Sequence, residues 1–417
     1  MKTATARLAT EALQRLAPAG GSPIAVAVSG GSDSMSLLAI ASDWCKRMQV
    51  ELDVVSVDHR LRPEAEGECK FVGRTVSSFG HQHTILRWQG KPEGNLQAEA
   101  RRARYTMIAK WAIERDIPKV ALGHTLDDQA ETVILNLARG SGVYGLSAMP
   151  EELRRCGVNW IRPLLQLRRK DLRCMLRSRA IPWIDDPSNE DLRFDRVRIR
   201  QALPMLEQIG LTASALGRTA ANMQRARQAL AMEVAKAAQR LVDVSTLGVL
   251  TIEAGFWDLA VETRYRLFAA AVRFHSNERH SRRLSAIRNS ISALRCDGVA
   301  TISACVLHLD RQRNLRIVRD HRRCGRPVRP DLVWDDRWRL AMPPDSNNCR
   351  IGALGRDGLK QFPGRSAAVS DRRALLSSPA LWKGDKVVES LVENAPGETD
   401  FILLKDRQMF LNFVKQV

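Results

Sequence analysis

The stretch IAVAVSGGSDSMSLLAIASDW, residues 24–44, joins two patterns that belong to different kinds of secondary structure. Residues 24–28 form an apolar run rich in β-branched side chains, which predicts a short buried strand of a parallel sheet. From Ser34 to about residue 48 the apolar spacing predicts a helix. Between them, residues 29–34 are all small or acidic. Glycines, hydroxyls and one carboxylate therefore stand where a strand gives way to a helix.

This junction predicts a phosphate-binding loop. Gly30 and Gly31 would leave backbone N–H groups uncovered, and the following helix would add the partial positive charge of its N-terminus. Hydroxyl groups add further donors, on Ser29, Ser32 and Ser34. The loop lacks the Lys-Ser/Thr ending of kinase-type and GTPase-type loops, which excludes those classes. Asp33 would repel a phosphate unless a cation lay between them, so the sequence predicts Mg²⁺ held by Asp33 and the phosphates. A purely structural Gly-Gly turn is the alternative.

Strand and helix patterns then alternate along the chain. The predicted strands and helices follow one another at 50–59, 64–79, 83–88, 95–116, 119–125 and 126–139. Alternation of this kind predicts an α/β fold with a doubly wound parallel sheet, Rossmann-like in plan. Ligands of such sheets bind beyond the carboxyl ends of the strands. The loop at 29–34, Asp58 and the segment 124–131 all fall there.

The length of 417 residues predicts more than one domain. We expect a catalytic domain over residues 1–210, beginning with an amphipathic helix. A transit peptide is the alternative for that helix, but the strand at 24 leaves no room for a discarded leader. A long helix at 212–242 opens a mostly helical middle domain, 211–320. After a Pro- and Arg-rich linker at 319–331 we expect a small α+β C-terminal domain, 325–417.

The composition points to a polyanionic partner. Lys and Arg number 65 against 46 Asp and Glu, which gives a net charge of +19 and favours nucleic acid over a membrane. Arg-rich stretches at 154–179 and 282–288 would follow a phosphate backbone. No apolar run reaches the length of a membrane-spanning helix. The eight cysteines form no CxxC, which excludes a zinc ribbon and is typical of reduced cytoplasmic thiols.

The SGGSDS motif resembles the signature of PP-loop ATP pyrophosphatases, enzymes that cleave ATP between the α and β phosphates and adenylate a carbonyl-type oxygen. Over roughly residues 20–210 further motifs resemble the tRNA(Ile)-lysidine synthase family. They are VDHRLR (57–62), EARRARY (99–105), GHTLDDQAETVILNLARGSGVYGLSAM (123–149), RPLL (162–165) and DPSNEDLRFDRVRIR (186–200).

The resemblance implies a ligase that forms a carbon–nitrogen bond. ATP would adenylate the C2 oxygen of the wobble cytidine of a CAU-anticodon isoleucine tRNA. The side-chain amine of free L-lysine would then attack C2, release AMP and leave lysidine. The implied requirements are ATP, Mg²⁺, L-lysine and this tRNA. We expect a cytoplasmic monomer or homodimer with no membrane partner.

The candidate catalytic residues are Asp33, Arg104, Asp128 and Glu131. Asp128 and Glu131 share a helix face and would bind the lysine ammonium and help remove its proton. A cluster that only complements the helix dipole is the alternative, and it stays open for Asp127. Asp58 and His124 join the expected ATP site, while a transition-metal site at His124 is disfavoured. The resemblance places tRNA contacts on Arg101, Arg139, Asn189, Arg196 and Arg200.

Two positions depart from the family pattern. Thr125 stands where a second histidine is common, and Val197 stands where an asparagine is usual. Three other functions remain as alternatives. A tRNA thiolase would need an active-site thiol or a CxxC-held cluster, and a small-molecule amidotransferase or NAD synthetase would not explain the basic excess. A non-catalytic RNA-binding module would have no need of the carboxylates at 33, 128 and 131.

Overall fold

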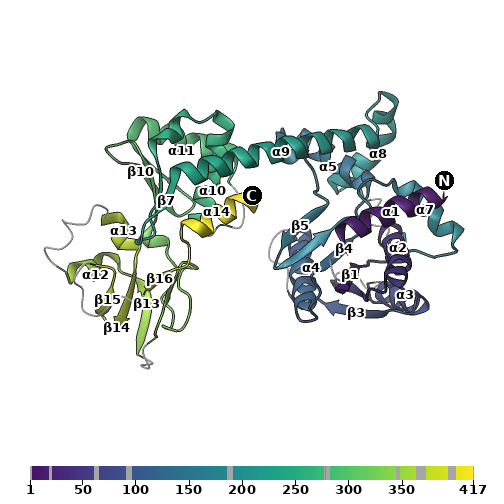
Figure 1. The fold of residues 1–417 in the computed structure, drawn as a ribbon, viewed down its shortest axis with the longest axis horizontal. Coiled ribbons are helices and arrows are strands. Elements are labelled where there is room, and N and C mark those ends of the chain that lie inside the picture. The colour runs from purple at the N-terminus through teal and green to yellow at the C-terminus, as the bar shows by residue number, and fades with distance from the viewer. Residues whose placement is uncertain are drawn as a thin grey trace. The chain divides into compact units, whose positions relative to one another are not determined.

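The computed structural model describes residues 2–17, 21–60, 65–90, 96–185, 191–276, 278, 282–343, 348–362, 372–392 and 401–416. These residues form two compact units, Met1–Arg227 and Gln228–Val417. Each unit is described by itself below, with the element labels of Figure 1.

A six-stranded sheet forms the centre of the first unit, in the order β3-β2-β1-β4-β6-β5. Its strands are β1 (Ile24–Ala27), β2 (Leu52–Asp58), β3 (Gln82–Arg87), β4 (Lys119–Leu122), β5 (Glu152–Arg155) and β6 (Val158–Ile161). Neighbouring strands are parallel except for β5, which pairs antiparallel with β6. The predicted doubly wound sheet is confirmed. Because β1 connects to β2 on one side and β4 lies on the other, the β1–β4 boundary is the switch point where ligands bind in such sheets.

Helices cover both faces of this sheet (Figure 1). The helices of this unit are α1 (Lys2–Leu16), α2 (Ser32–Met48), α3 (Ala65–Ser78), α4 (Leu96–Ile113), α5 (Leu126–Ala138), α6 (Val143–Leu146), α7 (Arg169–Ser178) and α8 (Asp195–Gln208). Of these, α6 and α8 pack against α5. Side chains alternate along a strand, so β1 serves two cores. Ile24 and Val26 join the core made with α1, α2, α3 and α7. Ala25 and Ala27 join the core made with α4.

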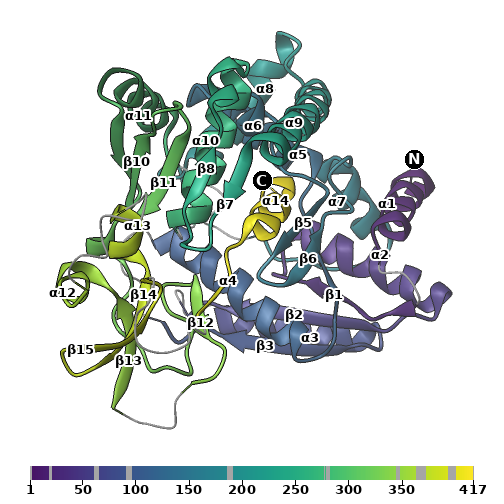
Figure 2. The ribbon, with the colours of Figure 1, turned by 60° about the vertical axis from the view of Figure 1, so that its left-hand side comes forward.

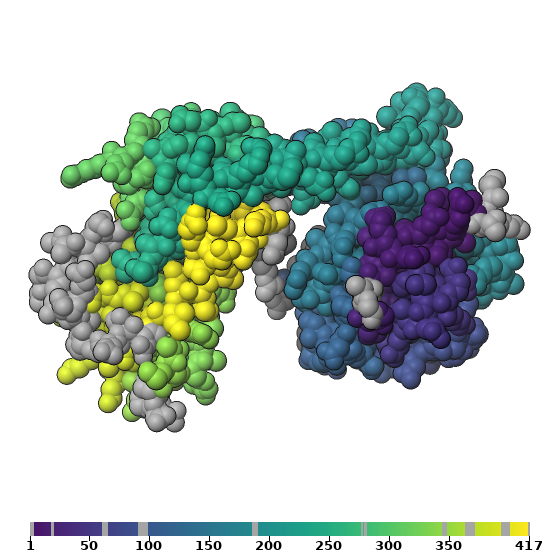
Figure 3. All heavy atoms as spheres, viewed as in Figure 1, coloured from purple at the N-terminus to yellow at the C-terminus, as the bar shows by residue number. Residues whose placement is uncertain are grey.

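The amphipathic first helix is confirmed. Ala9 and Leu13 are fully buried, whereas Leu8 is half exposed. The outer face of α1 forms part of the surface of the first unit, where it is drawn in purple in Figure 3.

The predicted long helix is α9 (Ala213–Leu241), which crosses the boundary at residue 227. Next to it the second unit contains the helices α10 (Val261–Ser276) and α11 (Leu284–Asp297), a 3₁₀ helix at Ala254–Asp258, and a five-stranded antiparallel sheet in the order β7-β8-β11-β10-β9. This sheet was not predicted from the sequence. Its strands are β7 (Val242–Val244), β8 (Leu250–Ile252), β9 (Val299–Ile302), β10 (Cys305–Leu309) and β11 (Leu315–Arg319).

The C-terminal part forms two small antiparallel sheets, β12-β16 and β13-β14-β15. Their strands are β12 (Trp338–Leu340), β13 (Cys349–Ala353), β14 (Pro379–Lys383), β15 (Lys386–Ser390) and β16 (Phe401–Leu403), with the short helices α12 (Gly355–Lys360) and α13 (Arg372–Ser377) beside them. The last helix, α14 (Arg407–Gln416), packs against α10 and β7 (Figure 2).

The segment expected to be a linker, 319–331, is mostly exposed, but two contacts tie it to the rest of the unit. Arg319 is buried and donates two hydrogen bonds to Asp335, each 3.2 Å long. Val328 pairs with Ile351 across an antiparallel bridge. The other arginines of this segment, at 322, 323, 326 and 329, are exposed. The linker stays a prediction. The three domain boundaries stay predictions.

The segment after β4 lies very close to the first turn of α2. A Cβ added to Gly123, the residue after β4, would lie 2.9 Å from the carbonyl oxygen of Asp33 and 3.0 Å from Cα of Ser34. These are backbone atoms of α2 and cannot turn away. Glycine at 123 therefore lets the start of α2 lie directly beside the segment that leads into α5.

We expect Gly123→Ala to lower the free energy of unfolding by about 1–3 kcal/mol, because the methyl group overpacks a rigid backbone contact. Urea unfolding followed by circular dichroism measures the change. Gly67→Ala is the matched control, since Gly67 lies in α3 with open space around its Cα, and it should stabilise by about 0.5–1 kcal/mol. Equal stability of the Gly123→Ala variant and the parent would contradict the close contact.

Candidate functional site

The glycine-rich loop has the form of an anion cradle. Gly30 has a φ of +88°, a region that side chains avoid, and an added Cβ would lie 3.1 Å from Cδ1 of Ile184. Gly31 is the N-cap of α2 and no side chain caps it, so the N–H groups of the first turn remain available to a ligand. The Ser34 hydroxyl donates to the Gly31 carbonyl over 2.9 Å and braces the turn. The helix begins at Ser32, two residues earlier than predicted.

Three carboxylates, on Asp33, Asp128 and Glu131, converge on the guanidinium of Arg169. Its Nε donates to Asp33 Oδ2 over 2.8 Å and its Nη2 donates to Asp128 Oδ1 over 3.0 Å. Its Nη1 lies 3.6 Å from Glu131 Oε1. The side chains of all four are at most 18% exposed. We call these four residues the carboxylate–arginine cluster. It joins the loop at the end of β1 to the helix that follows β4.

In the carboxylate–arginine cluster, burial disfavours the charged forms and the opposite charges favour them. Burial works against the charge of Arg169, but Asp128, Asp33 and Glu131 raise the pKa of its guanidinium above the ordinary value. Burial raises the pKa of Asp33, with Arg169 opposing it and Asp128 adding to it. The pKa of Asp128 is lowered despite burial, because Arg169, His124 and hydrogen bonds from Thr125 favour the charged form. Such a site needs bound cations to stay ionised.

Glu131 is fully buried and has a free oxygen. Its Oε1 accepts a hydrogen bond of 2.9 Å from Nε of Arg200, in addition to the ion pair with Arg169. Its Oε2 is buried and, among the residues that the structure describes, has no hydrogen-bond partner. An unpaired buried carboxylate oxygen is costly, so Oε2 is open to a donor from water or from a ligand.

Asp127 belongs to a different group. It accepts from Nε of Arg168 and from the backbone N–H of Arg169, at 3.2 and 2.7 Å. Arg168 also donates to Glu207 in α8. Asp127 therefore anchors the start of α7, and this geometry favours a structural role for it.

Thr125, which stands where the family commonly has a histidine, has a structural role at the start of α5. It is the N-cap of α5, and its hydroxyl and the Asp128 side chain form a capping box. Asp128 Oδ2 accepts both the backbone N–H of Thr125, over 2.7 Å, and its hydroxyl, over 2.9 Å. The cap fixes one oxygen of Asp128 and aims the other at Arg169.

His124 and Arg104 lie on the same side of the site. Burial lowers the pKa of His124 to about 3, against a smaller opposing effect of Asp128. Its Nδ1 has no hydrogen-bond partner within the described part of the chain. The imidazole is therefore neutral near pH 7. Arg104 is half-buried in α4, and burial lowers the pKa of its guanidinium. Among the described residues it has no hydrogen-bond or ion-pair partner, which suits an anion arriving from outside.

The remaining predicted residues lie as follows. Asp58 ends β2 and accepts the N–H of Arg60 over 2.8 Å, as in a turn. Arg101 lies over the ring of Tyr105 at 5.4 Å. Arg139 pairs with Asp195 at the surface over 3.2 Å. Arg196 is partly exposed near the start of α8, with Val197 buried beside it. Asn189 lies outside the described residues.

Sequence reasoning missed Arg169 as a site residue and assigned it to a run of RNA-facing cations. A signal was present. Residues 158–161, Val-Asn-Trp-Ile, are apolar at three of four positions, and they form β6, parallel to β4. The carboxyl end of that strand points to the same edge of the sheet, so the arginines that open the next helix had to lie near the loop.

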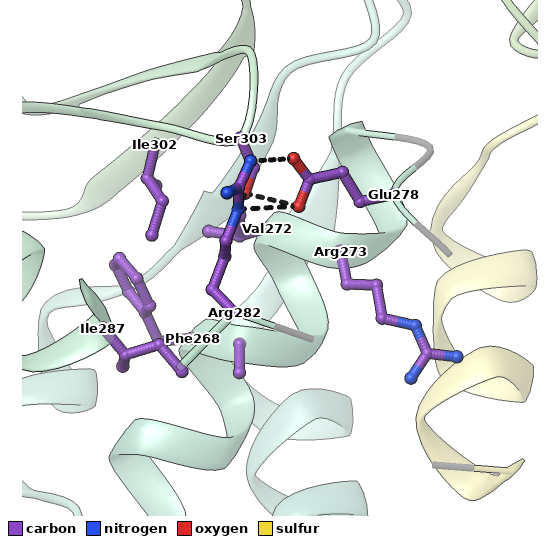
Figure 4. A pocket seen from close by; sticks show the side chains of 9 residues that line it. Phe268, Val272, Arg273, Glu278, Arg282, Ile287, Ile302 and Ser303 are labelled. Atoms are coloured by element: carbon purple, nitrogen blue, oxygen red, sulfur yellow. Dashed lines mark hydrogen bonds and ion pairs between the residues drawn. The ribbon is translucent and has the colours of Figure 1, made fainter. Parts of the chain in front are cut away.

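The second unit contains a small cavity that is a weaker candidate for a functional site. The cavity is lined by apolar side chains and by Arg282, Glu278 and Ser303, which are hydrogen-bonded to one another (Figure 4). Glu278 neutralises Arg282, and Arg273, which also lines the cavity, lies over the ring of Phe413 at 4.9 Å. Within the described ranges, no group of three or more histidine, cysteine or acidic side chains could hold a metal ion, and no helix is long and apolar enough to cross a membrane.

Comparison with known proteins assigns the family. A family profile described as a PP-loop domain matches residues 4–206. A tRNA(Ile)-lysidine synthase of Ruegeria pomeroyi is 39% identical over 379 residues, which cover 90% of each chain. One of Rhodopseudomonas palustris is 41% identical over 65% of this chain and 80% of its own, and one of Wolbachia pipientis is 32% identical over 76% of each. The profile covers the loop and the carboxylate–arginine cluster, and the first relative extends the similarity through the second unit. This chain belongs to the tRNA(Ile)-lysidine synthase family.

Proposed function

We propose that this protein uses ATP to adenylate the C2 oxygen of the wobble cytidine of a CAU-anticodon isoleucine tRNA, and that the side-chain amine of free lysine then displaces AMP to form lysidine. The single observation that carries this proposal is the carboxylate–arginine cluster beside an uncapped, glycine-lined helix N-terminus. The arrangement offers a place for polyphosphate and a place for an ammonium group next to each other.

The loop would bind the phosphates. N–H groups at the start of α2 supply hydrogen bonds to the oxygens, and Gly30 keeps the approach clear. Arg104, which lacks a described partner, would bind an oxygen of the reacting phosphate, and neutral His124 would accept or donate one hydrogen bond there. Asp58 would lie toward the adenosine.

Mg²⁺ fits the donor set. Asp33 is a carboxylate of raised pKa that is neutralised by a single guanidinium and lies next to the loop. Magnesium prefers such oxygen ligands together with phosphate oxygens. Asp33 would hold the ion, which neutralises charge on the phosphates when bound.

Asp128 and Glu131 would receive the lysine side chain. Both point into the cluster from one face of α5, and Glu131 offers a buried oxygen without a donor. An ammonium group has three N–H donors and can serve both carboxylates. A carboxylate there can also take the proton that the amine must lose before it attacks.

The RNA would be held by the basic surface. The net charge of +19 is that of a chain that binds phosphate backbone. The predicted contacts are Arg101, Arg139, Asn189, Arg196 and Arg200. Arg200 would act indirectly, since it is bonded to Glu131. Cytoplasmic location and oligomeric state stay predictions.

Radiolabelled lysine tests the proposal. The full chain, ATP, Mg²⁺ and an unmodified CAU-anticodon isoleucine tRNA should transfer the label into RNA, at the wobble cytidine. The same tRNA with uridine at that position is the control and should stay unlabelled. Labelling of neither tRNA would contradict the proposal.

Glu131→Gln should raise the KM for lysine about 10-fold or more, because a charge-assisted hydrogen bond is lost. Pyrophosphate released without lysine should change less, since adenylation does not use this carboxylate. Asp127→Asn is the matched control, and its KM should stay within about 2-fold of the parent. A Glu131→Gln variant that keeps its lysine KM but loses adenylation would show that this carboxylate serves ATP instead.

His124 should make stability depend on pH. Its pKa is lowered from 6.5 to about 3 in the folded chain. Between those values the unfolded state binds a proton and the folded state does not, so stability is full above about pH 6.5 and falls as the pH drops, by up to about 1.4 kcal/mol per pH unit. In His124→Gln this dependence is absent. Urea unfolding at pH 7 and pH 5 should therefore show the parent losing more stability than the variant, and equal losses would mean that His124 is protonated normally.

A further inference from the structure

We propose that Arg169 occupies the lysine site until nucleotide binds, and so couples the affinities for ATP and lysine. This inference rests on the proposed function and adds to it an order of binding. The Arg169 side chain donates hydrogen bonds both to Asp33 of the phosphate loop and to Asp128 of the proposed lysine site.

Arg169 and a lysine ammonium would compete for the same oxygen of Asp128. Its Oδ2 is used twice by the Thr125 cap. Its Oδ1 is held by Nη2 of Arg169 over 3.0 Å. A lysine ammonium that binds this carboxylate strongly must therefore take the oxygen that Arg169 holds.

Glu131 leads to the same conclusion. Its Oε1 already faces Arg169 and Arg200, and only Oε2 is without a donor. A third cation added to the pocket while Arg169 stays would lie close to two guanidinium groups. With Arg169 displaced, one ammonium replaces one guanidinium and the charge of the pocket is unchanged. The guanidinium therefore stands in for the substrate amine.

The phosphate loop supplies an alternative partner for Arg169. Helix α7, which begins with this residue, runs along the loop, and Nε of Arg173 one turn later donates to the Ser32 hydroxyl over 3.1 Å. Phosphate oxygens bound to the N–H groups of α2 would lie beside Asp33, the partner of Arg169 Nε. An arginine prefers such oxyanions and can turn to them from the same backbone position.

The consequence is reciprocal coupling. If nucleotide phosphates draw Arg169 away from Asp128, they raise the affinity for lysine, and lysine must raise the affinity for nucleotide by the same factor. A purely structural Arg169 makes the opposite prediction, because its loss would leave the carboxylates disordered and would weaken lysine binding. The sign of the effect separates the two roles.

Calorimetric titration of the full chain with L-lysine, with and without the α,β-methylene analogue of ATP plus Mg²⁺, tests the proposal. In the parent we expect the analogue to tighten lysine binding by roughly 5–150-fold. Arg169→Gln should bind lysine more tightly than the parent when no analogue is present, and its coupling factor should approach one. Arg168→Gln removes the same charge from the neighbouring residue, outside the cluster, and should keep the parent's coupling.

Arg169→Lys gives a second variant in case the glutamine variant fails to fold. Its ammonium keeps the charge but makes fewer hydrogen bonds, so its lysine affinity without analogue should lie between those of the parent and Arg169→Gln. Equal or weaker lysine binding by both variants, or coupling that survives in them, would overturn the proposal. Should the parent transfer lysine into tRNA yet show no coupling, the order of binding is wrong and the proposed function stands.

Discussion

The contact between Gly123 and the backbone of Asp33 is the constraint on which the site depends. It brings the residue after β4 within van der Waals distance of the first turn of α2. Two helix N-termini then lie at one switch point, α2 with an open glycine loop and α5 with a threonine cap. Any side chain at 123 would separate them. The glycine loop and the helix that carries Asp128 and Glu131 would then lie further apart.

The three carboxylates that this contact brings together must be balanced by positive charge. Placing three carboxylates together in a buried pocket costs free energy unless cations neutralise them. The chain supplies Arg169 and Arg200, and the proposed reaction supplies two more cations, a metal with the nucleotide and the ammonium of lysine. Arg169 neutralises these carboxylates in the structure, and under the proposal above it does so in place of a substrate cation. Stability of the free protein and affinity for its substrates are thus opposed in the same four side chains.

Much of the first unit could be predicted from the sequence. The strands at β1 to β4 and the helices between them follow from alternating apolar periodicity, and the loop follows from its glycines at a strand-to-helix junction. Arg169 could not be placed as readily, because its bond to Asp33 spans 136 residues and no local pattern records such a pairing. Thr125 was taken as the loss of a histidine, whereas hydrogen bonding makes it the cap that aims Asp128. The five-stranded sheet of the second unit was missed because its strands are three to five residues long and are interrupted by helices, so no alternating run is long enough to recognise.

Identifying which phosphate bond of ATP is broken tests the central claim most directly. The proposed reaction attacks the innermost phosphorus of ATP, so ³¹P NMR of a reaction with tRNA and lysine should show AMP and pyrophosphate accumulating together. ADP and orthophosphate as the products would contradict it.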